Sequence, residues 1–116
     1  MIKRVHHIDL RVKNLEASVS YFKRLGFQEL RKTSESRLSV EVVLPGPDQV
    51  IFELRQGKDN EVGINHIAFL KENDSALDGL KKNGIEFNKE VRFVKDTGRS
   101  VINFTDIDGN KWQLTD

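Results

Sequence analysis

The chain has 116 residues, of which 19 are Lys or Arg, 18 are Asp or Glu, 3 are His and none is Cys. This length suits one domain, and a hydrophobic fraction of 37% is typical of a folded chain rather than a disordered one. The formal charge of +1 argues against a nucleic-acid partner, and the sequence offers neither a membrane-spanning apolar run nor a signal-peptide core, so we expect a cytoplasmic protein. Without Cys, any bound metal needs nitrogen and oxygen ligands.

The second half of the chain repeats the pattern of the first. VHHIDLRVKN at 5–14 is matched by INHIAFLKEN at 64–73, and the amphipathic stretch after each ends in a glycine, Gly26 or Gly84. Later in each half, an apolar strand carries one polar residue, Glu53 in VIFELRQ and Gln113 in KWQLT. Such landmarks at nearly constant offsets indicate a duplication. We predict one domain over 1–116, with a first module of about 1–57, a linker of about 58–62 and a second module of about 63–116.

Each module is predicted to contain a strand, a helix and three more strands. Alternating apolar residues indicate the first strand, and a stripe of apolar residues three to four positions apart, preceded by Asn14 as a cap and ended by Gly26, indicates the helix. The predicted elements are strand 5–12, helix 15–25 and strands 27–33, 37–44 and 49–55, then strand 64–71, helix 74–83 and strands 86–94, 99–105 and 110–115.

These modules predict an α+β fold, with a cupped, mixed, eight-stranded sheet and the helices outside. The phase of the alternation places the side chains of His7, Asp9 and Arg11 on the face without the helix. The other predicted cup-facing positions of the first and fourth strands are His66, Ala68, Leu70, Ile51, Glu53, Arg55, Lys111, Gln113 and Thr115. The predicted core under the helices is Ile8, Leu10, Phe52, Leu54, Ile67, Phe69, Trp112 and Leu114.

Four polar residues on that face occupy equivalent positions of the two repeats. They are His7, Glu53, His66 and Gln113. Imidazole and carboxylate are common ligands of divalent ions, and an amide oxygen adds a weaker bond. An isolated His on a strand is more often an ordinary polar residue, but four residues related by the repeat favour a metal site.

The sequence resembles the vicinal oxygen chelate superfamily, which includes glyoxalase I, methylmalonyl-CoA epimerase, extradiol dioxygenases, fosfomycin-resistance transferases and bleomycin-binding proteins. The similarity covers essentially the whole chain. It is carried by the first-strand pattern of 7–12, by YFKRLGF at 21–27, by NHIAF at 65–69 and by DIDGNKWQL at 106–114.

The resemblance implies that His7, Glu53, His66 and Gln113 bind a divalent metal, with Ni, Co, Mn, Zn and Fe all compatible. Glyoxalase-like enzymes commonly have a Glu where this chain has Gln113, whereas epimerase-type members use His, Gln, His and Glu in chain order. The order in this chain is His, Glu, His and Gln. It contains the same four residue types, with the pair from the first module and the pair from the second module exchanged. Glu53 is then the one candidate carboxylate base, next to a metal that acts as a Lewis acid.

Several positively charged or polar positions predict an anionic substrate. Arg11 stands where glyoxalase-like members hold a substrate carboxylate, although an ion pair with Asp9 is an equally good interpretation. The other predicted substrate-binding residues are Arg55, Asn103 and Lys111.

The sequence therefore favours a small metal-dependent lyase or isomerase acting on an α-carbonyl compound. The alternative is a non-catalytic binding protein of the bleomycin-resistance type. Such proteins line the groove with aromatic residues, whereas Trp112 and most of the seven Phe residues are predicted to point away from the cup, which favours an enzyme. A fosfomycin-type transferase or a dioxygenase ranks last, because those proteins have a carboxylate ligand at the position of Gln113. We expect a small-molecule substrate and a homodimer. The sequence agrees equally with a cup formed within one chain and with a cup formed by two chains that exchange modules.

Overall fold

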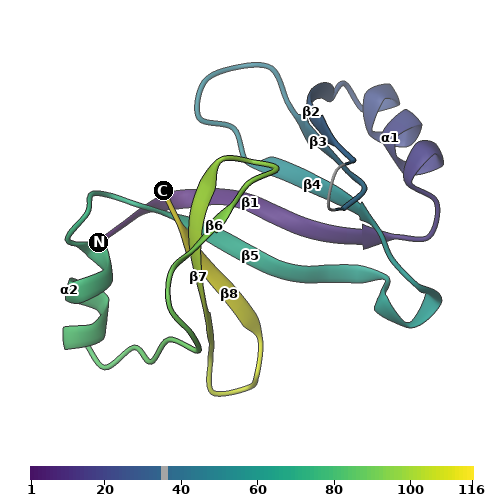
Figure 1. Ribbon diagram of the computed structural model, residues 1–116. Helices are drawn as coiled ribbons and strands as arrows, with labels where there is room; N and C mark the ends of the chain where they lie inside the picture. The colour runs from purple at the N-terminus through teal and green to yellow at the C-terminus, as the bar shows by residue number, and fades with distance from the viewer. Residues whose placement is uncertain (35–36) are drawn as a thin grey trace. The chain divides into compact units, whose positions relative to one another are not determined.

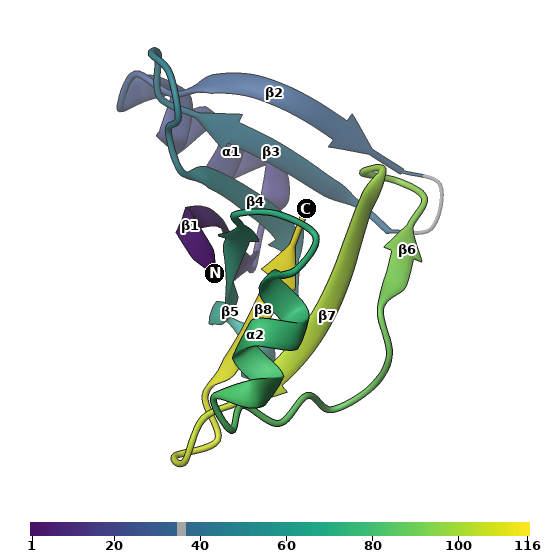
Figure 2. The ribbon, with the colours of Figure 1, turned by 90° about the vertical axis from the view of Figure 1, so that its left-hand side faces the viewer.

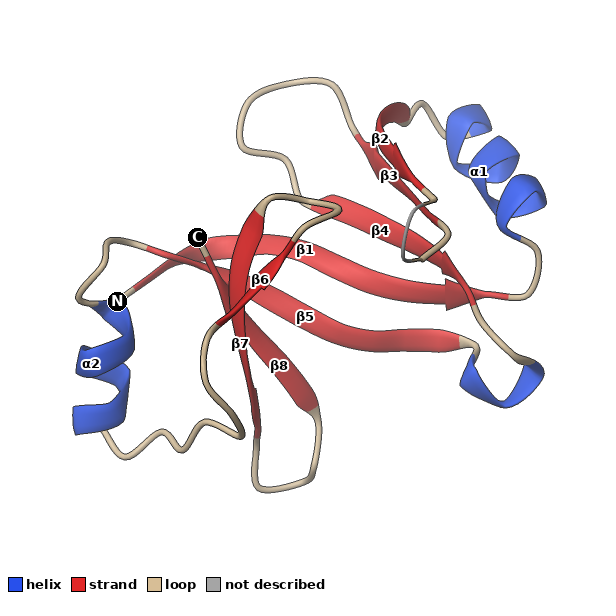
Figure 3. Ribbon diagram, in the orientation of Figure 1, coloured by secondary structure: helices blue, strands red, loops and turns tan. Residues whose placement is uncertain are grey.

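The computed structural model describes residues 1–34 and 37–116, which form strands and two α-helices (Figure 1). The chain divides into two compact units: a first unit, His7–Asn65, and a second unit made of Met1–His6 and His66–Asp116. The elements are β1 (Ile2–Val12), α1 (Leu15–Arg24), β2 (Gln28–Thr33), β3 (Ser39–Val43), β4 (Ile51–Gln56), β5 (Gly63–Lys71), α2 (Ala76–Lys82), β6 (Arg92–Val94), β7 (Arg99–Thr105) and β8 (Lys111–Thr115), with a 3-10 turn at Asp59–Glu61 (Figure 3).

In the first unit, the strands are ordered β2-β3-β4-β1, with α1 against one face of this sheet (Figure 2). β1 and β4 are parallel, while β3 is antiparallel to both β4 and β2. The side chains of Val42 and Leu54 on the helix side are fully buried and pack with residues such as Phe52. The alternation of the strands therefore sends apolar residues toward α1 and leaves the polar positions on the other face.

The N-terminus of α1 is held by two side chains. Asn14 caps the helix as predicted, because its Oδ1 accepts a hydrogen bond from the backbone N–H of Ala17 at 2.9 Å. Gln56 at the end of β4 accepts from the N–H of Leu15 at 3.0 Å. After the helix, Gly26 has a φ of 103°, a left-handed conformation that favours glycine.

The second unit repeats this plan. The first half of β1 lies beside β5, followed by β8, β7 and β6, with β5 and β8 parallel and the later pairs antiparallel. Leu80 of α2 packs with Ile102 and Leu114, and Trp112 stacks on Phe69 with ring centroids 5.2 Å apart. The α+β class and the eight-stranded mixed topology are thus confirmed.

Most predicted elements differ from the structure at one or both ends, usually by one or two residues, and β1, α2 and β6 are three of them. β1 begins at Ile2 rather than at residue 5, and its first residues belong to the second unit. α2 begins at Ala76 rather than at residue 74, because the side chain of Asn73 accepts from the N–H and Oγ of Ser75 and makes a turn there. The predicted strand 86–94 is reduced to Arg92–Val94, with a single bridge from Phe87 to Phe104 before it.

Among the residues that the structure describes, no helix has both the length and the apolar character needed to cross a membrane.

Candidate functional site

A row of three carboxylates crosses the helix-free face of the first unit. Asp9 of β1 lies directly opposite Glu53 of β4, and Glu53 lies directly opposite Glu41 of β3. The three side chains are almost completely buried, with Asp9 and Glu41 0% exposed and Glu53 2% exposed. Like charges at opposed positions of neighbouring strands repel one another, so this row needs cationic partners.

Arginines supply these partners. Arg11 Nε lies 2.7 Å from Asp9 Oδ1, and Arg55 Nη1 lies 3.2 Å from Asp9 Oδ2. Arg11 of β1 and Arg55 of β4 lie directly opposite each other, two residues after Asp9 and Glu53 respectively. A further arginine, Arg31 of β2, approaches Glu41 with a separation of 4.0 Å between Nη1 and Oε1.

Glu53 is paired with Arg37. Its Oε2 accepts a hydrogen bond from Arg37 Nη2 at 3.1 Å. Burial raises the pKa of Glu53 from its ordinary 4.5 to about 7; Asp9 and Glu41 raise it as well, while the positive charges of Arg37 and Arg55 oppose the increase. A carboxyl group with a pKa near neutrality can both accept and donate a proton under physiological conditions.

The second unit has an equivalent row without charge. Gln113 of β8 lies opposite Ala68 of β5 and opposite Asn103 of β7, as Glu53 lies opposite Asp9 and Glu41. Gln113 is buried, and its Nε2 donates a hydrogen bond to Asn103 Oδ1 at 3.0 Å. The duplicated scaffold thus carries carboxylates in one unit and amides in the other.

The two predicted His ligands stand at equivalent places of their units. His7 lies opposite Ile51 and two residues before Asp9, and its side chain is 3% exposed. His66 lies two residues before Ala68 in β5 and is half-buried. Neither His lies directly opposite the polar residue of the fourth strand, because the register pairs Glu53 with Asp9 and Gln113 with Ala68.

The chemistry of the predicted metal ligands fits a divalent ion, since it combines two imidazoles, one carboxylate and one amide. Each unit contributes two of the four residues: His7 and Glu53 belong to the first, and His66 and Gln113 to the second. Within residues 1–34 and 37–116, no group of three or more His, Cys, Asp or Glu side chains is arranged to hold a metal. The four-residue metal site stays a prediction.

The predicted substrate-binding residues occupy different environments. Arg11 and Arg55 are both engaged by Asp9, so the ion pair considered for Arg11 is present. Asn103 is exposed and accepts the hydrogen bond from Gln113. Lys111 is exposed and lies opposite Thr105 on the neighbouring strand. Their role in binding a substrate also stays a prediction.

Three residues that contact the carboxylate row or belong to it were not predicted from the sequence: Arg31, Arg37 and Glu41. The alternation of SVEVV at 39–43 places Glu41 on the face of Glu53 once the register is known, and that pattern was the available signal. Arg37 lies between β2 and β3, outside regular structure, and no periodic pattern marks it. Its position beside Glu53 follows from the tertiary structure.

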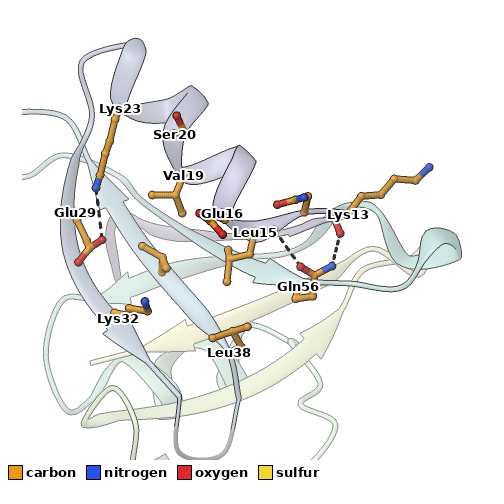
Figure 4. A pocket seen from close by; sticks show the side chains of 12 residues that line it. Lys13, Leu15, Glu16, Val19, Ser20, Lys23, Glu29, Lys32, Leu38 and Gln56 are labelled. Atoms are coloured by element: carbon orange, nitrogen blue, oxygen red, sulfur yellow. Dashed lines mark hydrogen bonds and ion pairs between the residues drawn. The ribbon is translucent and has the colours of Figure 1, made fainter.

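A groove on the opposite face of the first unit has a volume of about 830 Å³. It lies between α1 and the β2–β3 strands, with apolar side chains such as Leu15, Val19 and Leu38 along it and Lys32 at its edge (Figure 4). An ion pair of 3.8 Å between Lys23 and Glu29 closes one side. None of the predicted site residues lines this groove, so it is separate from the carboxylate row.

The sequence and the fold assign the chain to a known family. A family model for the Glyoxalase/Bleomycin resistance protein/Dioxygenase superfamily matches residues 4–114. The chain therefore belongs to this superfamily, which confirms the resemblance to vicinal oxygen chelate proteins. A search of curated protein sequences finds no match.

Solved structures with the same fold include epimerases and a dioxygenase. A variant of methylmalonyl-CoA epimerase from Streptomyces coelicolor, in complex with 2-nitronate-propionyl-CoA, has a TM-score of 0.80 at 17% identity, covering 99% of this chain and 97% of that one. Methylmalonyl-CoA epimerase from Mycobacterium tuberculosis has a TM-score of 0.79 at 14% identity, covering 98% and 87%. The 2,3-dioxygenase LapB from Pseudomonas sp. KL28 has a TM-score of 0.70 at 17% identity, covering 96% of this chain and 41% of that one. At these identities the likeness shows the shared fold.

Proposed function

We propose that the chain is a glyoxalase-like, metal-dependent isomerase or lyase acting on a small anionic α-carbonyl substrate, with Glu53 as the proton-transfer base. One observation carries this proposal: Glu53 is 2% exposed and has a pKa of about 7 on the polar face of its unit. The epimerase and dioxygenase neighbours and the family membership support metal-dependent chemistry of this general type. The choice of an α-carbonyl substrate and the role of Glu53 are our own proposal.

In the proposed reaction, the ionised carboxylate of Glu53 accepts the proton from the carbon next to the substrate carbonyl. The electron pair of the broken C–H bond moves toward the carbonyl oxygen, and the protonated Glu53 then returns its proton to carbon. The pKa of about 7 that Glu53 has without a bound metal suits both steps, because the base must be ionised at the start and acidic enough to release the proton afterwards. Burial away from water disfavours the charged carboxylate, and this keeps the pKa of Glu53 close to neutrality.

The divalent ion, when bound, would polarise the substrate carbonyl and stabilise negative charge on its oxygen. We propose His7, Glu53, His66 and Gln113 as its ligands. Because Gln113 is neutral, Glu53 is the single carboxylate among these donors, so it would serve both as ligand and as base. We propose that Arg11 and Arg55, although both also pair with Asp9, contribute positive charge for an anionic substrate, together with Asn103 and Lys111.

We also propose that the protein acts as a homodimer in the cytoplasm. Support for the dimer comes from the strands at the two sheet edges, β2 and β6, whose outer backbone groups need a partner or solvent. Exposed apolar side chains near these edges include Leu30 at 52% and Phe93 at 66% exposure.

Metal binding is tested by elemental mass spectrometry on the untagged protein and on the His7→Ala/His66→Ala variant. We expect a nearly stoichiometric divalent ion in the wild type and its loss in the variant. A wild type that stays metal-free after reconstitution with Ni, Co, Mn, Zn and Fe(II) would contradict the enzyme proposal and favour a ligand-sequestering protein.

Proton transfer is tested separately by hydrogen–deuterium exchange of 2-oxobutyrate in D₂O, followed by proton NMR. The metal-loaded wild type should catalyse exchange at the carbon beside the carbonyl, and Glu53→Gln should reduce the rate at least about 100-fold. Glu29→Gln is a matched control, because Glu29 is a partly exposed carboxylate of the same unit that pairs with Lys23. Equal rates for wild type and Glu53→Gln would exclude Glu53 as the base.

A further inference from the structure

One buried donor beside the carboxylate row has no partner. The Nε–H of Arg37 is buried and has no hydrogen-bond acceptor among the residues that the structure describes, 1–34 and 37–116. The same guanidinium donates through Nη2 to Glu53 Oε2 at 3.1 Å. A buried, unsatisfied donor costs free energy, so its retention calls for an explanation in terms of strain, function or a missing ligand.

The geometry of the guanidinium indicates what kind of group would satisfy this donor. A guanidinium presents its donors in a fixed planar fork that matches the two oxygens of a carboxylate or phosphate. Glu53 uses one oxygen on Nη2. An oxyanion that accepted from Nε–H would therefore lie next to the Glu53 carboxyl group, held by the same guanidinium.

The charge of the surrounding face also favours an anion. Four guanidinium groups lie against three carboxylates there, so the cluster carries one more positive than negative charge when all are ionised. The residues of the cluster are Asp9, Arg11, Arg31, Arg37, Glu41, Glu53 and Arg55. The side chain of Arg37 is 21% exposed as a whole and that of Glu53 is 3% exposed. The Nε atom itself is buried, so a carboxylate that binds there has to displace the atoms that cover it.

We propose that Arg37 is a substrate-specificity residue: its Nε–H, beside the Glu53 contact, receives a carboxylate group of the substrate. The inference rests on the proposed function for the idea that Glu53 is the base, and it names the substrate class as carboxylates. Arg37 bridges the two groups, so it places the bound carboxylate within one guanidinium's width of Glu53. Arg11 and Arg55 are both committed to Asp9, and Arg37 has the donor that remains to be filled.

The test measures anion binding to the 116-residue chain after metal removal with EDTA and dialysis to remove the EDTA, so that neither a metal site nor the carboxylates of EDTA contribute. Propionate is the probe, and propionamide is its neutral counterpart of similar shape. Arginine Nε–H signals are followed in ¹⁵N-correlated NMR spectra, and the Arg37 signal is identified by its absence in Arg37→Lys. We expect propionate, and not propionamide, to shift this signal in a saturable way.

Variants separate the proposed contact from general charge. Arg37→Gln should weaken propionate binding, measured on the Arg55 Nε–H signal, by about 10–100-fold, the range for loss of a charge-assisted hydrogen bond. Arg37→Lys keeps the charge and removes Nε–H, so it should lose most of the same affinity, and it also covers the case in which Arg37→Gln fails to fold. Arg31→Gln is the matched control, because it removes one charge from the same cluster at a 4.0 Å contact, and it should change affinity by less than about threefold.

Three results would overturn the proposal. Wild-type affinity in Arg37→Lys would exclude the Nε–H contact. Inorganic phosphate binding more tightly than propionate at this signal would assign the donor to a tetrahedral anion instead of a carboxylate. The Arg37 Nε–H signal could stay unchanged when propionate is added but shift in the Glu53→Gln variant. That result would show that Glu53 accepts from both Nε–H and Nη2 of Arg37 in solution. Propionate binding is independent of proton exchange on 2-oxobutyrate, so failure of this inference and failure of the proposed function are distinguishable.

Discussion

Glu53→Gln should increase the stability of the metal-free protein at neutral and higher pH. Glu53 as a whole residue is 2% exposed, and its pKa rises from 4.5 to about 7 because burial disfavours the charged form. The folded state therefore binds the Glu53 proton more tightly than the unfolded state does. The stabilisation from this proton is fully present below pH 4.5 and is lost as the pH rises through about 7.

The size of the effect follows from the two pKa values. Each pH unit between them is worth about 1.4 kcal/mol of unfolding free energy, so the interval from 4.5 to about 7 amounts to about 3 kcal/mol. A glutamine resembles a protonated glutamate in shape and charge and does not titrate. We therefore expect the variant and the wild type to have similar stability near pH 4, and the variant to be about 3 kcal/mol more stable near pH 8.

Urea unfolding from pH 4 to 8, followed by circular dichroism in buffers with EDTA, measures this difference. All other titrating groups occur in both proteins, so their contributions cancel when the two curves are subtracted. For Glu29→Gln, at a partly exposed site, the plot of unfolding free energy against pH should be parallel to that of the wild type over the whole range. Parallel curves for Glu53→Gln as well would refute the argument, because they would mean that Arg37 keeps the pKa of Glu53 near its ordinary value.

Three other predictions concern the scaffold. Leu54→Ala, at a fully buried position under α1, should lower the unfolding free energy by about 2–5 kcal/mol in urea titrations, and a smaller loss would mean that the core refills the cavity. Asn14→Ala removes the cap on the Ala17 N–H and should cost about 1 kcal/mol, whereas Asn14→Asp should retain most of the stability. Hydrogen bonds from Asn110 and Trp112 lower the pKa of Asp106 from 3.8 to about 2, so the stabilisation of this turn is present above pH 3.8 and is lost as the pH falls through about 2. Trp112 fluorescence should change over that range in the wild type, and an equal change in Asp106→Asn would contradict this assignment.

The local order of strands and helices was predictable because it depends on short-range patterns. A strand alternates its side chains between two faces, so the sequence alone places Asp9 with Glu53 on one face and Leu54 on the other. The cap at Asn14 and the turn at Asp106 are likewise built from neighbouring residues. The duplication predicted from the repeat is visible in the matching registers of Glu53 and Gln113.

The character of the candidate site was decided by the tertiary structure. Alternation chooses a face, but it does not choose which residues of separate strands stand opposite each other. The register pairs Glu53 with Asp9 and Glu41 rather than with His7, and a segment outside regular structure brings Arg37 to its carboxyl group. The pKa of Glu53 and the unsatisfied Nε–H of Arg37 both depend on burial by chain segments distant in sequence, and burial is a property that short-range sequence patterns do not encode.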